Sequence, residues 1–125
     1  MAGLSIPDDF PLNELVAQEL NQLVIGRHSL SLNFARDRVD IEAGFEYQSE
    51  GYEIIRAENS DLTTPAASLF PLLGQCITAV ERLPNNEIRL QFGASRTLKL
   101  TVDDQGYEAY HLFVAGQYVT ITKEW

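Results

Sequence analysis

The sequence predicts an α+β domain of two pseudo-equivalent halves, each with a helix and antiparallel strands, that share one core. Two stretches lead to this prediction, over residues 30–46 and 87–102, where apolar and polar side chains alternate on both sides of a short turn. The chain has 125 residues, enough for one real core and too few for two. We therefore expect a single domain over residues 1–125.

The stretch over residues 87–102 shows the pattern most clearly. Successive side chains of a strand point to opposite faces, so strict alternation predicts one face in the core and one in solvent. Residues 93–96 include a glycine and suit a hairpin loop. In the two hairpins we expect seven side chains to be buried: Leu32, Phe34, Ile41, Leu90, Phe92, Leu98 and Leu100.

The remaining elements follow from local signals along the chain. Leucines at helical spacing predict a helix over residues 11–21. Thr64 and Pro65 predict the cap and first turn of a second, short helix, which Pro71 should limit. Strands are predicted over residues 30–34, 39–46, 75–83, 107–114 and 118–122.

Four blocks recur in the same order, which predicts an internal repeat over approximately residues 11–58 and 64–125. The matched blocks are 20–25 with 73–78 (offset 53), 32–34 with 90–92 (58), 39–41 with 98–100 (59) and 50–53 with 105–108 (55). The offset changes only across expected loops. We expect Leu32 to superpose on Leu90 and Phe34 on Phe92.

Charge and composition narrow the range of partners. The formal net charge is -9, which disfavours nucleic acid and anionic membrane surfaces, so a basic protein is the natural complement. The first residues lack the features of a signal peptide, and no stretch approaches the ~20 apolar residues that span a bilayer. The one cysteine, Cys76, excludes an internal disulfide. We expect a soluble, cytoplasmic protein.

No motif indicates catalysis, a cofactor or a metal. His28 and His111 lack metal-ligand spacing and are interpreted as a turn residue and a strand residue. Cys76 lies among apolar residues and is expected to be buried and inert. The acidic pairs at 8–9 and 103–104 suit a helix start and a turn. We expect no enzyme, although groups from distant segments could still converge into a site.

The acidic residues concentrate in the first half. Residues 1–60 contain eleven Asp and Glu against four Arg, while residues 61–125 contain seven against five Lys and Arg. The expected partner-binding residues are Asp40, Glu42 and Glu46, on the polar face of one predicted strand, and Glu53 after it. This surface is either a solvated face that keeps the protein soluble or an acidic docking surface for a basic protein.

The second half resembles a known group of proteins. Leu73-Gly74-Gln75, the two strands of the later hairpin and Tyr107-Glu108-Ala109-Tyr110 are similar to small bacterial two-repeat proteins of unknown function that end in a Tyr-Glu-Ala-aromatic strand. Tyr110 stands where tryptophan is commoner. The resemblance covers residues 73–125 and, more loosely, 20–47. Such proteins are often suspected to be toxin immunity proteins, and the resemblance transfers no catalytic residue.

Three hypotheses follow. The first is a non-catalytic binding protein, such as an immunity or antitoxin-like inhibitor of a basic partner. The second is a small-ligand-binding protein or an unrecognised small enzyme with a site between the two halves, which a large internal pocket would favour. The third is a homo-oligomer that uses exposed aromatic surface, which an extensive apolar self-contact would favour.

Overall fold

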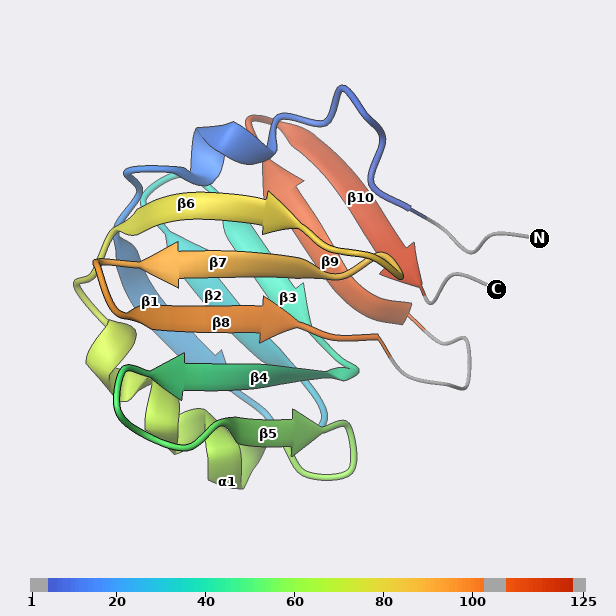
Figure 1. Cartoon of the computed structure of the whole chain (residues 1–125). Coiled ribbons are helices and arrows are strands. Elements are labelled where there is room, and N and C mark those ends of the chain that lie inside the picture. The colour runs from blue at the N-terminus through green and yellow to red at the C-terminus, as the bar shows by residue number, and fades with distance from the viewer. Residues whose placement is uncertain (1–4, 103–107, 123–125) are drawn as a thin grey trace.

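The computed structural model describes residues 5–102 and 108–122, which form a sandwich of two five-stranded antiparallel sheets (Figure 1). Sheet 1 has the strand order β1-β2-β3-β9-β10, and sheet 2 has the order β5-β4-β8-β7-β6. The strands are β1 (Leu20–Ile25), β2 (Leu30–Phe34), β3 (Arg38–Ile41), β4 (Gly44–Ser49), β5 (Ile55–Glu58), β6 (Ile77–Arg82), β7 (Ile88–Phe92), β8 (Arg96–Leu100), β9 (Glu108–Val114) and β10 (Gln117–Thr122).

The predicted α+β class, with a helix and strands in each half, is wrong. The described residues hold one short helical segment of ten residues, formed by α1 (Thr63–Ala66) and its 3-10 continuation η2 (Ala67–Leu72), and a single 3-10 turn η1 (Leu12–Leu15). The molecule is a β-sandwich, and the predicted helix over residues 11–21 ends after η1.

The 3-10 turn η1 and a β-bulge after it together explain the false helix, since Leu12 and Leu15 of the turn are both buried. In β1 the pairing shifts between Leu20 and Gln22, so Leu20 lies opposite Phe34 and Leu23 lies opposite Leu32. The extra residue lets two side chains three positions apart face the same side, which a regular strand does not allow. Spacing of three is the helical signature, and here a bulged strand produces it.

The two predicted hairpins are confirmed as β2–β3 and β7–β8. All seven side chains expected in the core are buried. The predicted strand over residues 39–46 is instead two strands, because the chain leaves sheet 1 after Ile41 and enters sheet 2 at Gly44. A Cβ atom on Gly44 would lie 2.2 Å from the carbonyl oxygen of Ala57, so this crossing requires a residue without a side chain.

The two halves of the chain exchange strands. The first three strands of each half form a meander in one sheet, and the last two strands of that half complete the other sheet, where β4 pairs with β8 and β9 pairs with β3 (Figure 1). Each sheet therefore contains strands from both halves.

The ladders of the two halves match in register. Leu32 lies opposite Val39 as Leu90 lies opposite Leu98, and β6 has the same bulge as β1, between Ile77 and Ala79. The segments that precede β1 and β6 correspond at an offset of 57, not at the predicted 53, because Leu20 and Ile77 hold the same place in their ladders.

Reciprocal backbone hydrogen bonds join these segments. The amide of Ala17 donates to the carbonyl of Ile77 (2.7 Å), and that of Gly74 donates to the carbonyl of Leu20 (2.8 Å). Both donors have left-handed φ values, 73° and 84°. Most of the predicted match of residues 50–53 with 105–108 is untested, because residues 103–107 lie outside the described ranges. The one described pair differs in position, since Glu53 lies between β4 and β5 while Glu108 begins β9.

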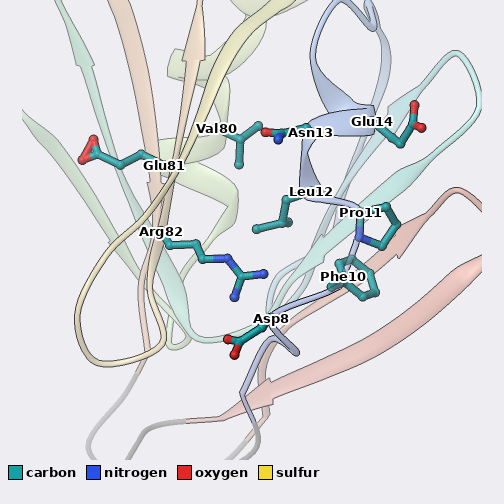
Figure 2. Close-up of a pocket in the computed structure, with 9 residues that line it drawn as sticks. All are labelled: Asp8, Phe10, Pro11, Leu12, Asn13, Glu14, Val80, Glu81 and Arg82. Atoms are coloured by element: carbon teal, nitrogen blue, oxygen red, sulfur yellow. The ribbon is translucent and has the colours of Figure 1, made fainter.

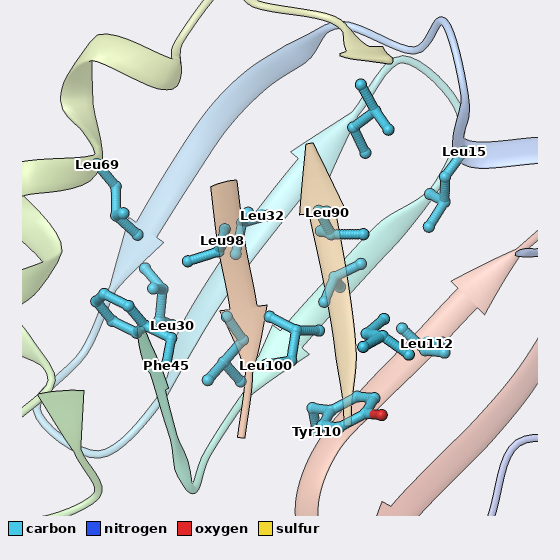
Figure 3. Packing of buried hydrophobic residues seen from close by; sticks show 14 of the residues in the cluster. Leu15, Leu30, Leu32, Phe45, Leu69, Leu90, Leu98, Leu100, Tyr110 and Leu112 are labelled. Atoms are coloured by element: carbon cyan, nitrogen blue, oxygen red, sulfur yellow. The ribbon is translucent and has the colours of Figure 1, made fainter. Parts of the chain in front are cut away.

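The core fills the space between the sheets. Figure 3 shows Leu30 and Leu32 of sheet 1 packed against Leu98 and Leu100 of sheet 2, with Leu69 of η2 at one side. Burial of such aliphatic side chains contributes about 1.5–3 kcal/mol each, so this layer is the main source of stability.

The helical segments cover two sides of the sandwich. α1 and η2 lie beside β5, while the N-terminal segment with η1 lies beside β6 (Figure 1). Asp61 caps α1, since its Oδ1 accepts the amide hydrogens of Thr63 (3.1 Å) and Thr64 (3.3 Å). The predicted cap, Thr64, is therefore inside the helix, and Pro71 lies within η2. Over residues 5–102 and 108–122, no helix has the length and apolar character needed to cross a bilayer.

Candidate functional site

The structure separates the four residues expected to bind a partner. Asp40 on β3 and Glu42 just after it lie on sheet 1, whereas Glu46 lies on β4 in sheet 2. Glu53 is exposed in the connection between β4 and β5. The cause is the crossing at residues 42–43, which divides the predicted strand between two sheets. The binding role of these residues stays a prediction.

The outer face of sheet 2 balances its own charges. Glu46 contacts Arg56 at 3.4 Å and Lys99 at 3.3 Å, and Lys99 reaches Glu87 at 3.9 Å. Arg89 and Glu81 form a further pair at 3.1 Å. Exposed pairs of this kind contribute at most about 1 kcal/mol each, so the face is a solvated surface in which Glu46 is already neutralised.

The outer face of sheet 1 is built around His111, on β9. Its Nδ1 lies 2.9 Å from the hydroxyl of Tyr118 and 3.0 Å from that of Thr120, both on β10. Its Nε2 lies 3.3 Å from Oε2 of Glu42 and 3.5 Å from Oε2 of Glu108. The imidazole side chain is only 11% exposed, so it sits at the bottom of this group. Both ring nitrogens are therefore fixed by side chains on neighbouring segments.

A third bulge brings Glu108 to this face. The pairing of β9 with β10 shifts between Ile121 and Thr122, so that Glu108, three residues before His111, points to the same side. The carbonyl of Ala109 then accepts the amide hydrogens of both Glu42 and Ala43, each at 2.9 Å. These backbone bonds place both carboxylates near Nε2 of the imidazole.

Aromatic side chains border the cluster. The guanidinium of Arg38 lies 4.0 Å from the centre of the Phe113 ring, which is 4.5 Å from the Tyr118 ring. Arg38 Nε is also 3.2 Å from Oδ1 of Asp40, although the two groups lack the alignment of a hydrogen bond. We call this surface the His111 face. It consists of Arg38, Asp40, Glu42, Glu108, His111, Phe113, Tyr118 and Thr120.

The two sheets differ at equivalent positions. In sheet 2, Glu46 lies between Lys99 and Arg56 across three neighbouring strands. In sheet 1 the same place is taken by His111, between Asp40 and Thr120. One row is a closed set of ion pairs, while the other combines an imidazole with acidic and hydroxyl groups. The two halves therefore differ in chemistry at this row, which lies on the His111 face in sheet 1.

A shallow groove, with a volume of about 810 Å³, lies between the N-terminal segment and β6 (Figure 2). The N-terminal segment from Phe10 to Leu12 forms one wall, and Val80 and Arg82 of β6 form the other. The guanidinium of Arg82 donates to the backbone carbonyls of residues 6 and 7, at 3.1 and 2.7 Å. These hydrogen bonds attach the N-terminal segment to β6, so the role of Arg82 in the groove is structural.

The other candidates from the sequence are scattered. Cys76 is exposed, so the prediction of a buried thiol is wrong; it precedes β6, in a bridge with Glu19 at the edge of the fold. His28 lies in the turn after β1, with Nδ1 2.7 Å from the carbonyl of Asn59. Asp8 and Asp9 lie in a turn before η1, and the pair at 103–104 lies outside the described residues.

Spacing analysis missed the His111 cluster because its members are far apart in the chain. Glu42 is 69 positions before His111, and Glu108 reaches the same face only through the bulge. One signal was present: His111, Phe113, Tyr118 and Thr120 occupy the outward positions of the last two strands, where the sequence has few charged residues.

Comparisons with family models, with curated proteins and with solved structures find no match for this chain. The similarity of its second half to suspected immunity proteins therefore stays a prediction.

Proposed function

We propose that this chain is a non-catalytic binding protein whose His111 face docks a basic protein partner. The observation that supports this most strongly is the contrast between equivalent rows of the two sheets. Glu46 is neutralised by Lys99 and Arg56, whereas Glu42 and Glu108 pair with no Lys or Arg among the described residues.

The composition of the face fits such a partner. It holds three carboxylates against one guanidinium, that of Arg38, and the hydroxyl-bearing ring of Tyr118 is 56% exposed beside them. Exposed carboxylates attract a basic partner over a distance, which raises the association rate. Tyrosine is enriched among the residues that contribute most to interface affinity. Carboxylates that would attract a basic partner thus lie beside a tyrosine that could contribute to the affinity of the complex.

An immunity or antitoxin-like inhibitor is the specific form that we propose. The family resemblance of residues 73–125 and the formal net charge of -9 support it, since masking a basic protein requires a surface of opposite charge. The alternative, a ligand or enzyme site between the two halves, has no comparable support: the core cluster that the two sheets share consists of hydrophobic side chains.

Association kinetics with a basic candidate toxin test the proposal. The test variant is the double reversal Glu42→Lys/Glu108→Lys, and the matched control is Glu19→Lys/Glu50→Lys, which changes the net charge equally at two exposed positions outside the His111 face. A chelator is present throughout, so that no metal ion contributes. Rates are measured at 0.1 M and 1 M salt, where the Debye length falls from about 10 Å to about 3 Å.

We expect the test variant to associate at least about tenfold more slowly than the control at low salt, and the difference to shrink at high salt. Circular dichroism checks that both variants keep the wild-type fold. Equal slowing by the two variants would mean that only net charge matters and would contradict the assignment of the His111 face. No slowing by either would contradict docking of a basic partner altogether.

A further inference from the structure

We infer that Glu42, Glu108 and His111 form a binding site for a divalent transition-metal ion of the Zn²⁺ class. This inference goes beyond the docking of a protein and does not depend on it. The three side chains offer one nitrogen and two oxygen atoms, all within 4.8 Å of one another. Zn²⁺ is bound by histidine nitrogen and carboxylate oxygen.

The distances fit a tetrahedral ion. Metal–ligand bonds of about 2.0–2.2 Å put neighbouring ligands of a tetrahedron about 3.3–3.6 Å apart. His111 Nε2 is 3.3 Å from the Glu42 carboxylate and 3.5 Å from that of Glu108. The trio can therefore hold an ion with small side-chain adjustments and leave the fourth position to water, since the two carboxylates are 39% and 60% exposed.

The imidazole is oriented as a metal ligand is. Ligating histidines use one ring nitrogen for the metal and bind a second group through the other, which fixes the ring. In this protein Nδ1 lies against the hydroxyls of Tyr118 and Thr120, and Nε2 is directed at the carboxylates. The two hydroxyls are themselves 2.6 Å apart, so they also form a hydrogen bond with each other.

The backbone holds the ligands before any ion binds. The carbonyl of Ala109 ties the crossing segment at Glu42 and Ala43 to the bulge of β9. Sheet 2 has a matching backbone hydrogen bond, in which the amide of Thr101 donates to the carbonyl of Gly44 at 3.3 Å. That bond lies beside the row of salt bridges around Glu46. The same backbone device thus supports ion pairs in one sheet and a ligand set in the other.

Isothermal titration of the full-length, chelator-treated protein with Zn²⁺ tests the inference. All proteins carry Cys76→Ser, which removes an exposed thiol that could bind the metal independently. The test variants are Glu42→Gln, Glu108→Gln and His111→Asn, and the matched control is His28→Asn, which removes the other histidine. Because the side chain of Glu108 is 60% exposed, we expect Glu108→Gln to keep the fold even if His111→Asn does not.

We expect one Zn²⁺ per chain, with affinity lowered at least about tenfold in each test variant and unchanged in the control, because even groups behind the ligands typically contribute that much. Co²⁺ should give the strong visible absorption of a tetrahedral site, and Mg²⁺ should not compete. Three results would overturn the inference: Zn²⁺ binding that survives Glu108→Gln and His111→Asn, loss of binding in His28→Asn, or no binding by the protein without these substitutions. Any of them would leave the cluster as an imidazole–carboxylate ion pair only.

Discussion

Phe34 and Phe92 hold equivalent places in the two halves and meet in the core, with ring centres 6.4 Å apart and planes inclined by 17°. Each is the last residue of its strand, opposite the bulged start of β1 or β6. The contact therefore joins the two sheets at the point where the two halves approach each other through reciprocal backbone bonds.

Tyr110 adds a polar anchor to the same core. Its ring is fully buried, and its hydroxyl donates a hydrogen bond to the carbonyl of Asn86, 2.5 Å away (the ring is labelled in Figure 3). Burial, and secondarily the charge of Glu87, raises the pKa of Tyr110 well above its usual range. The phenol therefore stays neutral and keeps its donor at all ordinary pH values.

Truncation of Phe92 to alanine should lower the free energy of unfolding by about 3–5 kcal/mol, because the ring is almost fully buried and its loss leaves a cavity. Urea denaturation measures the change. Phe70→Ala is the control, since that ring is 53% exposed on η2 and should contribute much less. Equal losses of unfolding free energy in the two variants would show that the burial of Phe92 does not determine its contribution to stability.

At the scale of elements, α1 depends on Asp61 for its start. The carboxylate accepts two amide hydrogens at the first turn, and hydrogen bonds from Thr64, through its hydroxyl first and its amide second, lower the pKa of Asp61 below the ordinary value of 3.8. A carboxyl whose pKa is lower in the folded state stabilises the fold above its unfolded pKa and loses that effect as pH falls through the folded pKa.

Asp61→Asn should therefore lower the thermal midpoint at pH 7, and its difference from wild type should narrow as pH falls below 3.8. Thermal unfolding followed by circular dichroism between pH 7 and pH 2 measures this dependence. Glu53→Gln, in an exposed loop, is the control for the loss of one charge. A difference that stays constant over the whole pH range would show that ionised Asp61 does not stabilise the start of the helix.

The same elements show what local sequence patterns can and cannot predict. Both hairpins were predictable because alternation along a strand is a local property, and the buried faces followed from it. The predicted helix over residues 11–21 failed because the turn η1 and the bulge between Leu20 and Gln22 together imitate helical spacing. The predicted strand over residues 39–46 failed because nothing in its alternation marks the crossing between sheets at Gly44.

The candidate site was less predictable than the fold. Asp40 and Glu42 were expected on a binding surface, but the chemistry of His111 arises only from pairing β3 with β9. That pairing joins the two halves of the chain, and the bulge that turns Glu108 toward His111 depends on β10. A single sequence contains no signal for such long-range pairing, whereas it does contain the signal for each hairpin.

At the scale of the whole molecule, strand exchange couples the two halves. Sheet 1 takes β1, β2 and β3 from the first half and β9 and β10 from the second, and sheet 2 is completed in the same way by β4 and β5. Neither half can form a complete sheet alone, so each depends on the other for its central pairing. The two pairings that join the halves, β3 with β9 and β4 with β8, are both between strands distant in sequence, which favours slow folding.

We therefore expect the protein to unfold in one cooperative step. In native-state hydrogen exchange, the amides of β2 and β3 in sheet 1 should report the same free energy of opening as those of β7 and β8 in sheet 2. Phe92→Ala, which removes a side chain of sheet 2, should lower the protection of both sets by the same amount, because the core is shared and sheet 1 cannot persist without β9 and β10. Phe34→Ala, the equivalent change in sheet 1, is the reciprocal variant. Loss of protection confined to the substituted sheet would mean that the two sheets open independently despite the exchanged strands.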